Sequence, residues 1–255
     1  MQCSRLAERA LLGVLRFSGY QVISRLPAEW LRWLRSRSVP KHVLERLSIN
    51  CVLDVGANRG QFGTMLRQIG YKGWIISLEP VRVNLAALEK VAAAAGPWRV
   101  LPYALGASDG RQKINVTDRS ELSSFFTPNQ ESQSRFPGIR VARTEEVEVR
   151  RLDGIFDSCL EGIPSPRVYL KLDTQGYDLE VARGAEPVLD KVLALQTEIS
   201  FRPIYNGMSG FAMSVSQFQA YGFEVFDFTP VTWEKDQLRV IEMDCVMVRK
   251  MMSVR

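Results

Sequence analysis

The sequence predicts an α/β protein with a doubly wound, mostly parallel, seven-stranded sheet, preceded by an N-terminal helical extension. Two observations support this fold class. From Cys51 onward, short apolar runs alternate with segments of helical periodicity, which is the pattern of a βαβ sheet. The first apolar run leads directly into a glycine-rich turn, as the first strand of such a sheet does. We expect residues 1–50 to form the extension and residues 51–255 to form one domain.

The composition limits the classes of protein. At 255 residues, with 46% apolar and 24% charged residues, the chain can bury a full core, which argues against extensive disorder. The four cysteines lie far apart and include no C-x-x-C pair, so they indicate neither a disulfide framework nor a zinc site. No apolar run reaches the ~18 residues of a membrane span. We therefore expect a cytoplasmic protein.

The net charge of +5 belongs to the N-terminal segment. Residues 1–50 hold nine Lys or Arg and three Asp or Glu, whereas residues 51–255 hold 24 basic and 25 acidic residues. The main domain is slightly acidic and has no aromatic-basic RNA motif. We therefore expect no nucleic-acid partner.

A helix over residues 5–17 would place Arg5, Arg9 and Arg16 on one face, opposite an apolar stripe. Such a basic amphipathic helix suits an anionic membrane surface, so residues 1–40 are a candidate for peripheral contact with the inner face of a membrane. Packing of the same stripe on the main domain is the alternative. The sequence does not indicate an oligomeric state.

Each strand of the sheet is expected where a short apolar run occurs. The expected strands cover residues 51–55, 74–79, 98–105, 167–173, 192–199, 222–228 and 243–249. Helical stripes lie between several of them: Phe62, Met65, Leu66 and Ile69 form one, Val81, Leu85, Leu88 and Ala92 form another, and a third helix begins near Tyr177.

Residues 106–150 are polar and rich in Ser, Thr and Arg. Alternating stretches at 113–117 and 147–152 predict a loop or β-hairpin insertion over one end of the sheet. Because insertions at sheet ends often shape substrate pockets, we expect this one to lie near the substrate side.

The glycine turn indicates which ligand the sheet binds. A dinucleotide-binding loop has the spacing G-x-G-x-x-G, but the run from Gly56 to Gly60 lacks the middle glycine. Asp54, directly before the turn, would repel a phosphate. The same carboxylate would attract the ammonium and sulfonium charges of S-adenosylmethionine. Asp54 therefore favours a cationic ligand.

A second carboxylate lies where an adenosine ribose would need it. Glu79 ends the second strand, about 20 residues after the turn, and can accept hydrogen bonds from both ribose hydroxyls. The alternative is that Asp54 caps a helix and Glu79 is a solvated strand end. The two carboxylates together favour the ligand interpretation.

Five stretches of the chain carry a family resemblance: VLDVGANRGQFG, SLEPVRVNLAALE, ALGASDG, KLDTQGYDLEVARGAE and ALQTEIS. From about residue 50 to about residue 230, the chain resembles the FkbM-type methyltransferases. That family transfers the methyl group of S-adenosylmethionine, typically to hydroxyls of sugars, polyketides or glycolipids. The resemblance implies a Rossmann-like class I methyltransferase fold and S-adenosylmethionine as cofactor.

The resemblance also implies a set of cofactor-binding residues. These are Asp54, Gly56, Ala57, Asn58, Gly60 and Phe62 around the turn, Glu79 at the ribose, and Ala104, Leu105 and Asp109 beside the adenine. Ser123 and Ser124 match a serine-rich stretch of the family. Lys171 to Asp178 match its K-x-D-x-x-G-x-E pattern, with Gln175 where Glu is common and Asp178 in place of Glu.

Methyl transfer to oxygen needs a base near the acceptor hydroxyl. We expect the strands ending at Asp173 and Glu198 to neighbour the glycine strand, so both carboxylates would lie at the cleft mouth. Asp173 is the first candidate for the base, with Lys171 and Glu198 as helpers. Capping of the next helix is the alternative role for Asp173. His42 precedes the core and is expected to be a surface or packing residue.

No residue is assigned as a metal ligand. Two carboxylates near one cleft would also suit a divalent ion such as Mg²⁺, so metal dependence stays open.

The leading hypothesis is an S-adenosylmethionine-dependent O-methyltransferase acting on a small hydroxylated acceptor, a sugar or lipid-linked sugar. A non-catalytic binding or partner module that retains the fold is the alternative. A nicotinamide-dependent oxidoreductase is disfavoured by the missing middle glycine and by Asp54.

Overall fold

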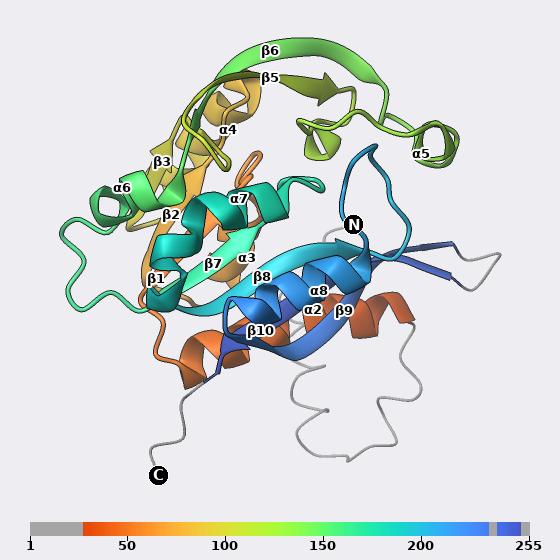
Figure 1. The fold of residues 1–255 in the computed structure, drawn as a ribbon. Helices are drawn as coiled ribbons and strands as arrows, with labels where there is room; N and C mark the ends of the chain where they lie inside the picture. Colours follow the sequence, from red (N-terminus) through yellow and green to blue (C-terminus); the bar gives the residue numbers. More distant parts are fainter. Residues whose placement is uncertain (1–27, 235–238, 251–255) are drawn as a thin grey trace.

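The structure is a computed structural model, and it describes residues 28–234 and 239–250. Its main sheet has seven strands in the order β3-β2-β1-β7-β8-β10-β9 (Figure 1). The strands are β1 (Cys51–Val55), β2 (Trp74–Leu78), β3 (Trp98–Leu101), β7 (Val168–Leu172), β8 (Val192–Ser200), β9 (Phe223–Glu234) and β10 (Arg239–Arg249). All neighbouring pairs are parallel except those that β10 makes with β8 and β9. The predicted fold class, a mostly parallel seven-stranded sheet, is confirmed.

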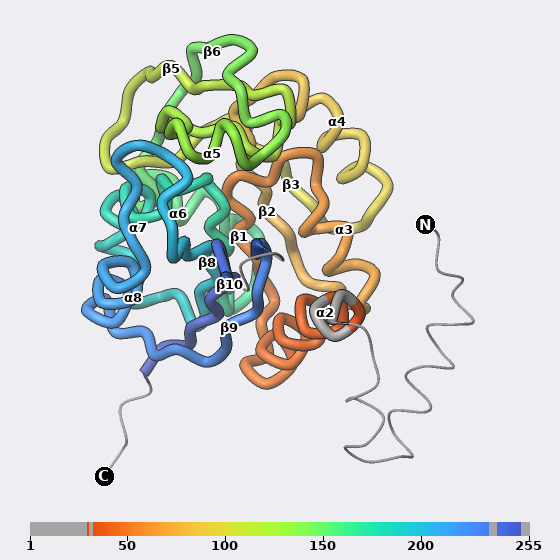
Figure 2. The backbone as a smooth tube through the Cα atoms, turned by 90° about the vertical axis from the view of Figure 1, so that its right-hand side faces the viewer, coloured from red at the N-terminus to blue at the C-terminus, as the bar shows by residue number. Residues whose placement is uncertain are grey.

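Helices cover both faces of the main sheet (Figure 2). On one face lie α2 (Ala28–Arg46), α3 (Gln61–Gln68) and α4 (Arg82–Ala93), and on the other lie α6 (Leu152–Cys159), α7 (Asp178–Ala185) and α8 (Phe211–Ala220). A short 3-10 helix, η3 (Glu186–Lys191), follows α7. Each face has its own apolar core, and the strands β1, β7 and β8 contribute to both. Burial on both faces explains why β1, β7 and the first half of β8 are mostly apolar.

The predicted strands 222–228 and 243–249 are present as the longer β9 and β10, and two further differences change the topology. The stretch 98–105 divides into β3 and β4 (Ala104–Leu105), which belong to different sheets. Pro102 lies between them and has no N–H to donate to a strand ladder, so the ladder ends there. In addition, β8 is the second neighbour of β1, not a direct one, because β7 lies between them. The prediction that both strands adjoin the glycine strand is therefore wrong for β8.

The insertion over residues 106–150 forms a second sheet at one end of the first (Figure 1). In it, β5 (Gly110–Thr117) pairs antiparallel with β6 (Val141–Arg150), and β4 pairs parallel with β6. The two long strands of the insertion thus form an antiparallel pair. Between its strands the chain forms a short 3-10 helix, η2 (Ser120–Leu122), and α5 (Gln130–Arg135).

The N-terminal extension is described only from residue 28 onward. There α2 packs against β9, where the His42 ring stacks on Phe226 at 5.9 Å and Arg35 forms an ion pair with Asp227. The predicted helix over residues 5–17 lies outside the described residues. Within the described part of the chain, no helix has the length and apolar character needed to cross a membrane.

The helix α7 approaches the insertion very closely. A Cβ atom on Gly184 would lie 2.0 Å from the carbonyl oxygen of Gly106. Real Cβ atoms do not tolerate such a contact, so glycine at position 184 allows the helix to pack beside the start of the insertion.

This contact predicts a specific stability difference. We expect Gly184→Ala to lower the free energy of unfolding by about 1–3 kcal/mol, because the added methyl group must displace backbone atoms. The matched control is Gly154→Ala in α6, where a Cβ would meet no atom within 4 Å. That change should be neutral or stabilise by up to about 1 kcal/mol through helix propensity. Urea unfolding of the three proteins measures the difference, and equal effects of both changes would contradict the packing account.

Candidate functional site

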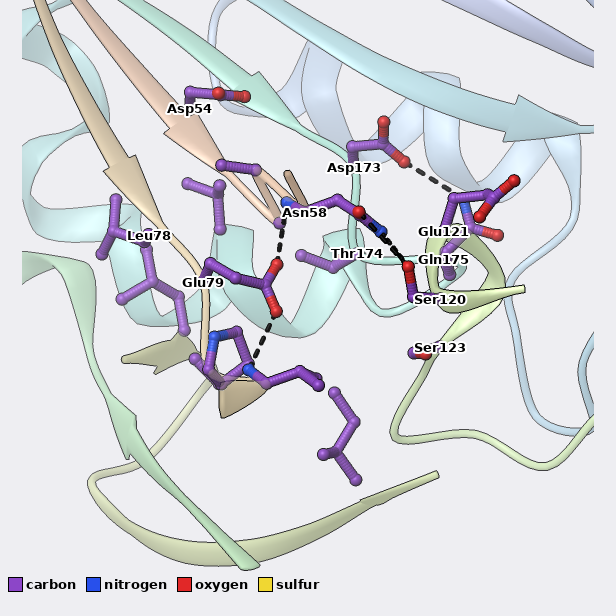
Figure 3. A pocket seen from close by; sticks show the side chains of 18 of the residues that line it. Asp54, Asn58, Leu78, Glu79, Ser120, Glu121, Ser123, Asp173, Thr174 and Gln175 are labelled. Atoms are coloured by element: carbon purple, nitrogen blue, oxygen red, sulfur yellow. Dashed lines mark hydrogen bonds between the residues drawn. The ribbon is translucent and has the colours of Figure 1, made fainter. Parts of the chain in front are cut away.

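A cavity of about 260 Å³ lies at the carboxyl ends of β1, β2 and β7, beneath the insertion (Figure 3). Its polar wall carries Asp54, Asn58, Glu79, Ser120, Glu121, Ser123, Asp173, Thr174 and Gln175. Its apolar wall includes Phe62, Leu78, Val81, Tyr103, Ala104, Leu105, Ile114 and Phe125. The parallel sheet brings these strand ends together, which is where ligands bind in open α/β folds.

The turn between β1 and α3 requires glycine at its first position. Gly56 has a φ of +77°, and a Cβ there would lie 2.1 Å from the carbonyl oxygen of Asp173. The backbone N–H groups of Gly56 and Ala57 donate to the carbonyl of Leu78, which fixes the turn against β2. Gly60, in contrast, faces Leu88 and Trp98 and does not line the cavity.

Asp54 is held inside the cavity wall by a chain of hydrogen bonds. Its Oδ2 accepts from the Ser77 hydroxyl at 3.0 Å, and Ser77 Oγ accepts from the Trp98 indole at 3.0 Å. Burial raises the pKa of Asp54 to about 6, although the positive charge of Lys171 and the Ser77 bond act in the opposite direction. A cationic ligand in the cavity would offset this cost of burial.

Glu79 is also buried, and its carboxylate binds the glycine turn. One oxygen accepts from the N–H of Asn58 and the other from the N–H of Val81, both at 2.8 Å. The neighbouring Asn84 side chain, like these two N–H groups, lowers the pKa of Glu79. Burial nevertheless raises the pKa of Glu79 from 4.5 to about 7, so ionising it in the folded protein costs about 3 kcal/mol more than ionising it in water.

Lys171 lies next to the base candidate. Its Nζ is 3.1 Å from Asp173 Oδ2 and 4.0 Å from Asp244 Oδ1, and it lies 5.6 Å from the centre of the Phe62 ring. Burial alone would lower the pKa of Lys171, but the carboxylates of Asp173, Asp244 and Glu198 raise it above its ordinary value. Lys171 itself is buried and does not line the cavity, whereas the Asp173 side chain is 34% exposed and does.

Glu198 lies behind Asp173 and contributes no surface to the cavity. Gln175 bridges the two carboxylates, because its amide nitrogen lies 3.1 Å from Asp173 Oδ1 and 3.0 Å from Glu198 Oε2. Burial raises the pKa of Glu198 well above its ordinary value, and the charges of Asp173 and Glu242 raise it further.

Asp173 does not cap the following helix, so that alternative role is wrong. The N-cap residue of α7 is Tyr177. The buried Asp178 instead fixes the turn, accepting from the N–H of Thr174 at 2.9 Å and from the hydroxyls of Thr174 and Thr197. Aspartate fits this position because the two threonine hydroxyls reach its shorter side chain.

Most of the predicted cofactor-binding residues line this cavity. Asp54, Gly56, Ala57, Asn58, Phe62, Glu79, Ala104 and Leu105 all line it. Asp109 does not: it is exposed, and it accepts a hydrogen bond from the N–H of Arg151, just before α6. His42 lies on α2 against β9, away from the cavity.

The structure adds residues that the sequence did not identify. Ser77 and Trp98 hold Asp54, Ser120 pairs with Asn58 at 3.4 Å, and Tyr205 contacts Gln175. A sequence signal existed only for Ser77, a lone polar residue in an apolar strand, which the parallel register places beside Asp54. The other contacts join segments whose separation in the sequence hides them.

These groups suit S-adenosylmethionine. The ammonium charge would suit Asp54, the sulfonium charge would suit the carboxylates of Asp54 and Asp173, and the ribose hydroxyls would suit Glu79. The apolar wall would accept a flat base such as adenine. Among the described residues, no group of three or more His, Cys, Asp or Glu side chains is arranged to hold a metal ion.

Comparisons with known proteins bear on the family and the fold of the chain. The sequence profile of the Methyltransferase FkbM domain matches residues 54–225. No curated protein sequence matches the chain. Among solved structures, the chain is similar to methyltransferase FkbM from Methylobacillus flagellatus KT, with 16% identity and a TM-score of 0.50. That likeness covers 78% of this chain but only 43% of the other, and at this identity it concerns the fold alone.

The chain is also similar to magnesium protoporphyrin IX methyltransferase from Synechocystis PCC 6803, whose structure contains bound S-adenosylmethionine. The identity is 12% and the TM-score 0.45, over 88% of this chain and 92% of that chain.

The buried carboxylates predict an unusual dependence of stability on pH. The pKa values of Asp54 and Glu79 are higher in the folded protein than their ordinary values of 3.8 and 4.5. Their contribution to stability is therefore fully present below about pH 4 and is lost as the pH rises through about 6 to 7. We expect the ligand-free protein to become more stable as the pH falls from 8 to 5.

An isosteric variant tests this account. Asp54→Asn removes the charge but keeps an oxygen for Ser77, so at pH 8 it should be more stable than the wild type by about 1–3 kcal/mol. The gap should close near pH 4. The exposed Glu161→Gln is the control and should leave the pH dependence unchanged. Thermal unfolding across the pH range measures both, and a stability gap that does not vary with pH would contradict the burial argument.

Proposed function

The chain belongs to the FkbM family of S-adenosylmethionine-dependent methyltransferases, and from this premise we propose that it methylates a hydroxyl group of a sugar, lipid-linked sugar or polyketide-type acceptor. Four carboxylates line one cavity, and the arrangement of three of them, Asp54, Glu79 and Asp173, carries the proposal. Asp54 and Glu79 suit the cofactor, and Asp173 stands on the same wall beside a buried lysine.

In this proposal Glu79 accepts the ribose hydroxyls, and the glycine turn with Asp54 receives the methionine end. Glu79 already has its two oxygens oriented by the N–H groups of Asn58 and Val81, so little reorganisation is needed on binding. Ala104 and Leu105 supply apolar contacts for the adenine.

When bound, S-adenosylmethionine supplies a methyl group already activated on a positively charged sulfur. The protein therefore has to position the acceptor oxygen and remove its proton. Asp173 is the group we assign to the proton, because it lines the cavity and remains partly exposed. The Lys171 ammonium, 3.1 Å away, stabilises the negative charge that Asp173 needs as a base.

The acceptor class is drawn from the family, and the location of the protein is drawn from its charge distribution. We propose a cytoplasmic enzyme whose basic residues 1–40 contact the inner face of a membrane, where lipid-linked sugars occur. Cosedimentation with vesicles containing anionic lipid, compared with vesicles of neutral lipid, tests this contact.

Calorimetric titration tests the cofactor. The wild type should bind S-adenosylhomocysteine and not NAD, while Asp54→Ala and Glu79→Ala should each weaken binding by about tenfold or more, because each removes a charged hydrogen-bond partner. The control is Asp109→Ala, which changes a carboxylate outside the cavity and should leave the affinity unchanged. Binding of NAD alone would favour an oxidoreductase, and binding of neither ligand would favour a partner module.

The base assignment makes a separate prediction. Asp173→Ala should keep the affinity for S-adenosylhomocysteine within about threefold, yet slow methyl transfer by about 100-fold or more, the usual contribution of a general base. Transfer of a labelled methyl group, with sugar, glycolipid and polyketide acceptors, provides the assay. Unchanged turnover in this variant would show that Asp173 is not the base.

A further inference from the structure

The side chain of Gln175 makes three hydrogen bonds, and the proposed function does not require any of them directly. Its amide nitrogen bridges Asp173 Oδ1 and Glu198 Oε2, at 3.1 and 3.0 Å. Its amide oxygen lies 2.9 Å from the hydroxyl of Tyr205. Two carboxylates that share one site repel each other, and an amide N–H₂ group between them relieves that repulsion with two donors. Gln175 therefore fixes which way Asp173 points.

The backbone of Gln175 is strained in order to reach this position. Its φ is +53°, in the left-handed region that residues other than glycine rarely adopt. The Ser124 hydroxyl, from the insertion, donates to the Gln175 carbonyl at 2.8 Å and holds the strained turn in place. Backbone strain of this kind persists only where surrounding contacts enforce it, and it is concentrated at functional sites.

Tyr205 connects Gln175 to the insertion above the cavity. It is almost fully buried, and its hydroxyl oxygen lies 2.8 Å from the carbonyl of Leu122 as well as 2.9 Å from Gln175 Oε1. The single proton can serve either acceptor. Leu122 belongs to η2, whose Ser120 and Glu121 line the cavity. One phenol thus contacts both the insertion and the residue that orients Asp173.

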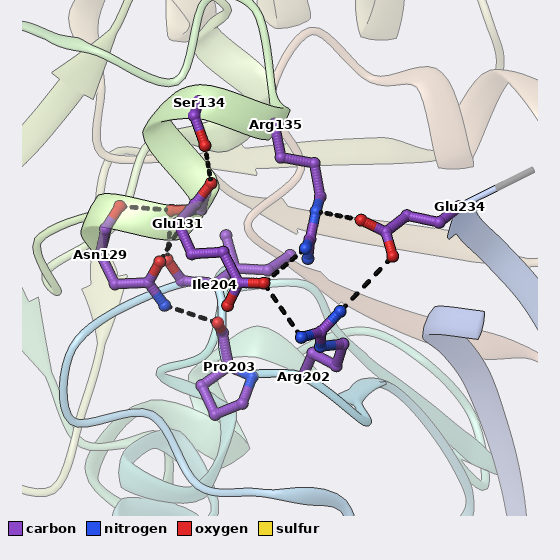
Figure 4. Close-up of polar contacts among 9 residues, drawn as sticks. Asn129, Glu131, Ser134, Arg135, Arg202, Pro203, Ile204 and Glu234 are labelled. Atoms are coloured by element: carbon purple, nitrogen blue, oxygen red, sulfur yellow. Dashed lines mark hydrogen bonds and ion pairs between the residues drawn. The ribbon is translucent and has the colours of Figure 1, made fainter. Parts of the chain in front are cut away.

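The loop that carries Tyr205 is fastened to the insertion on its outer side (Figure 4). Glu131 and Arg135 of α5 form an ion-pair network with Arg202 and with Glu234 at the end of β9, at 2.5 to 3.4 Å. Asn129 adds hydrogen bonds to the backbone of the same loop, to the carbonyls of Pro203 and Ile204. The insertion and the loop therefore form one roof over the site.

We propose that Gln175 is a positioning residue that orients the Asp173 carboxylate toward the methyl-transfer position, and that Tyr205 makes this orientation depend on the roof being in place. This inference rests on the proposed function. It also explains why an amide suits this position: a third carboxylate there would repel Asp173 and Glu198, whereas the amide bridges them.

The experiment uses two ligands and needs no acceptor. Sinefungin resembles S-adenosylmethionine but carries a carbon-bound ammonium in place of the methylsulfonium, whereas S-adenosylhomocysteine is neutral at that sulfur. The ratio of their dissociation constants reports the negative charge at the methyl position. The wild type should prefer sinefungin, and Gln175→Leu should reduce this preference about tenfold while S-adenosylhomocysteine affinity stays within about threefold.

Tyr205→Phe removes one oxygen and should reduce the sinefungin preference about threefold to fivefold, less than loss of the amide itself. If thermal unfolding shows that Gln175→Leu does not fold, Tyr205→Phe provides the test of the positioning role by itself. Gln219→Leu is the matched control, since it makes the same chemical change on the exposed face of α8 and should alter neither affinity.

The outcomes separate this proposal from the one on which it rests. Failure of the wild type to bind S-adenosylhomocysteine would overturn the proposed function, and this inference with it. Binding of S-adenosylhomocysteine without a preference for sinefungin would overturn the orientation of Asp173 alone. A preference in the folded Gln175 and Tyr205 variants equal to that of Gln219→Leu would overturn the positioning role.

Discussion

The burial of carboxylates at the carboxyl edge of the main sheet is the constraint on which the rest of the site depends. Parallel strands bring their ends to a single edge, so Asp54 of β1 and Asp173, directly after β7, lie close together there. Away from water an ionised carboxylate is costly unless it is paired or accepts hydrogen bonds. Each of these groups has such a partner, from the Ser77 hydroxyl to the Lys171 ammonium.

The roof, formed by the insertion and the loop after β8, is related to the same burial of carboxylates. An electrostatic attraction between a carboxylate and a cationic ligand is several times stronger in a partly dry cavity than in water. The insertion contributes to this environment, since its apolar side chains Phe125 and Ile114 line the cavity. Ion pairs from α5 to Glu234 and to Arg202, in the loop after β8, hold the insertion in a fixed position relative to the main sheet.

The sequence predicted those parts of the site that are formed by residues close together in the chain. The strand, glycine turn and helix from Cys51 to Gln68 follow from apolar periodicity, and Glu79 follows from the length of one βα unit. The prediction failed where a local rule was interrupted. Pro102 ended a strand early, and Asp109, which motif matching placed beside the adenine, instead binds the backbone ahead of α6.

The role of Gln175 could not be predicted for a different reason. Its partners Tyr205 and Ser124 lie 30 and 51 residues away in the sequence, on segments without regular periodicity. Only the folded chain brings them together. The helix α6 was missed for a local reason, because its first residue, Leu152, was predicted to end an alternating strand-like stretch.

The free-energy cost of the buried charges at the site favours an active enzyme over a binding module that has only retained the fold. A binding module that kept the cofactor would need Asp54 and Glu79, but it would have no use for a buried lysine beside Asp173, Glu198 and Asp244. Apolar residues of similar size can replace a buried charge cluster without loss of stability, and often with a gain. In the function that we propose, this cluster serves Asp173. Hydrogen bonds from Lys171 and Gln175 hold the partly exposed carboxylate, and the neighbouring ammonium stabilises its charge, as removal of a proton from an acceptor hydroxyl would require.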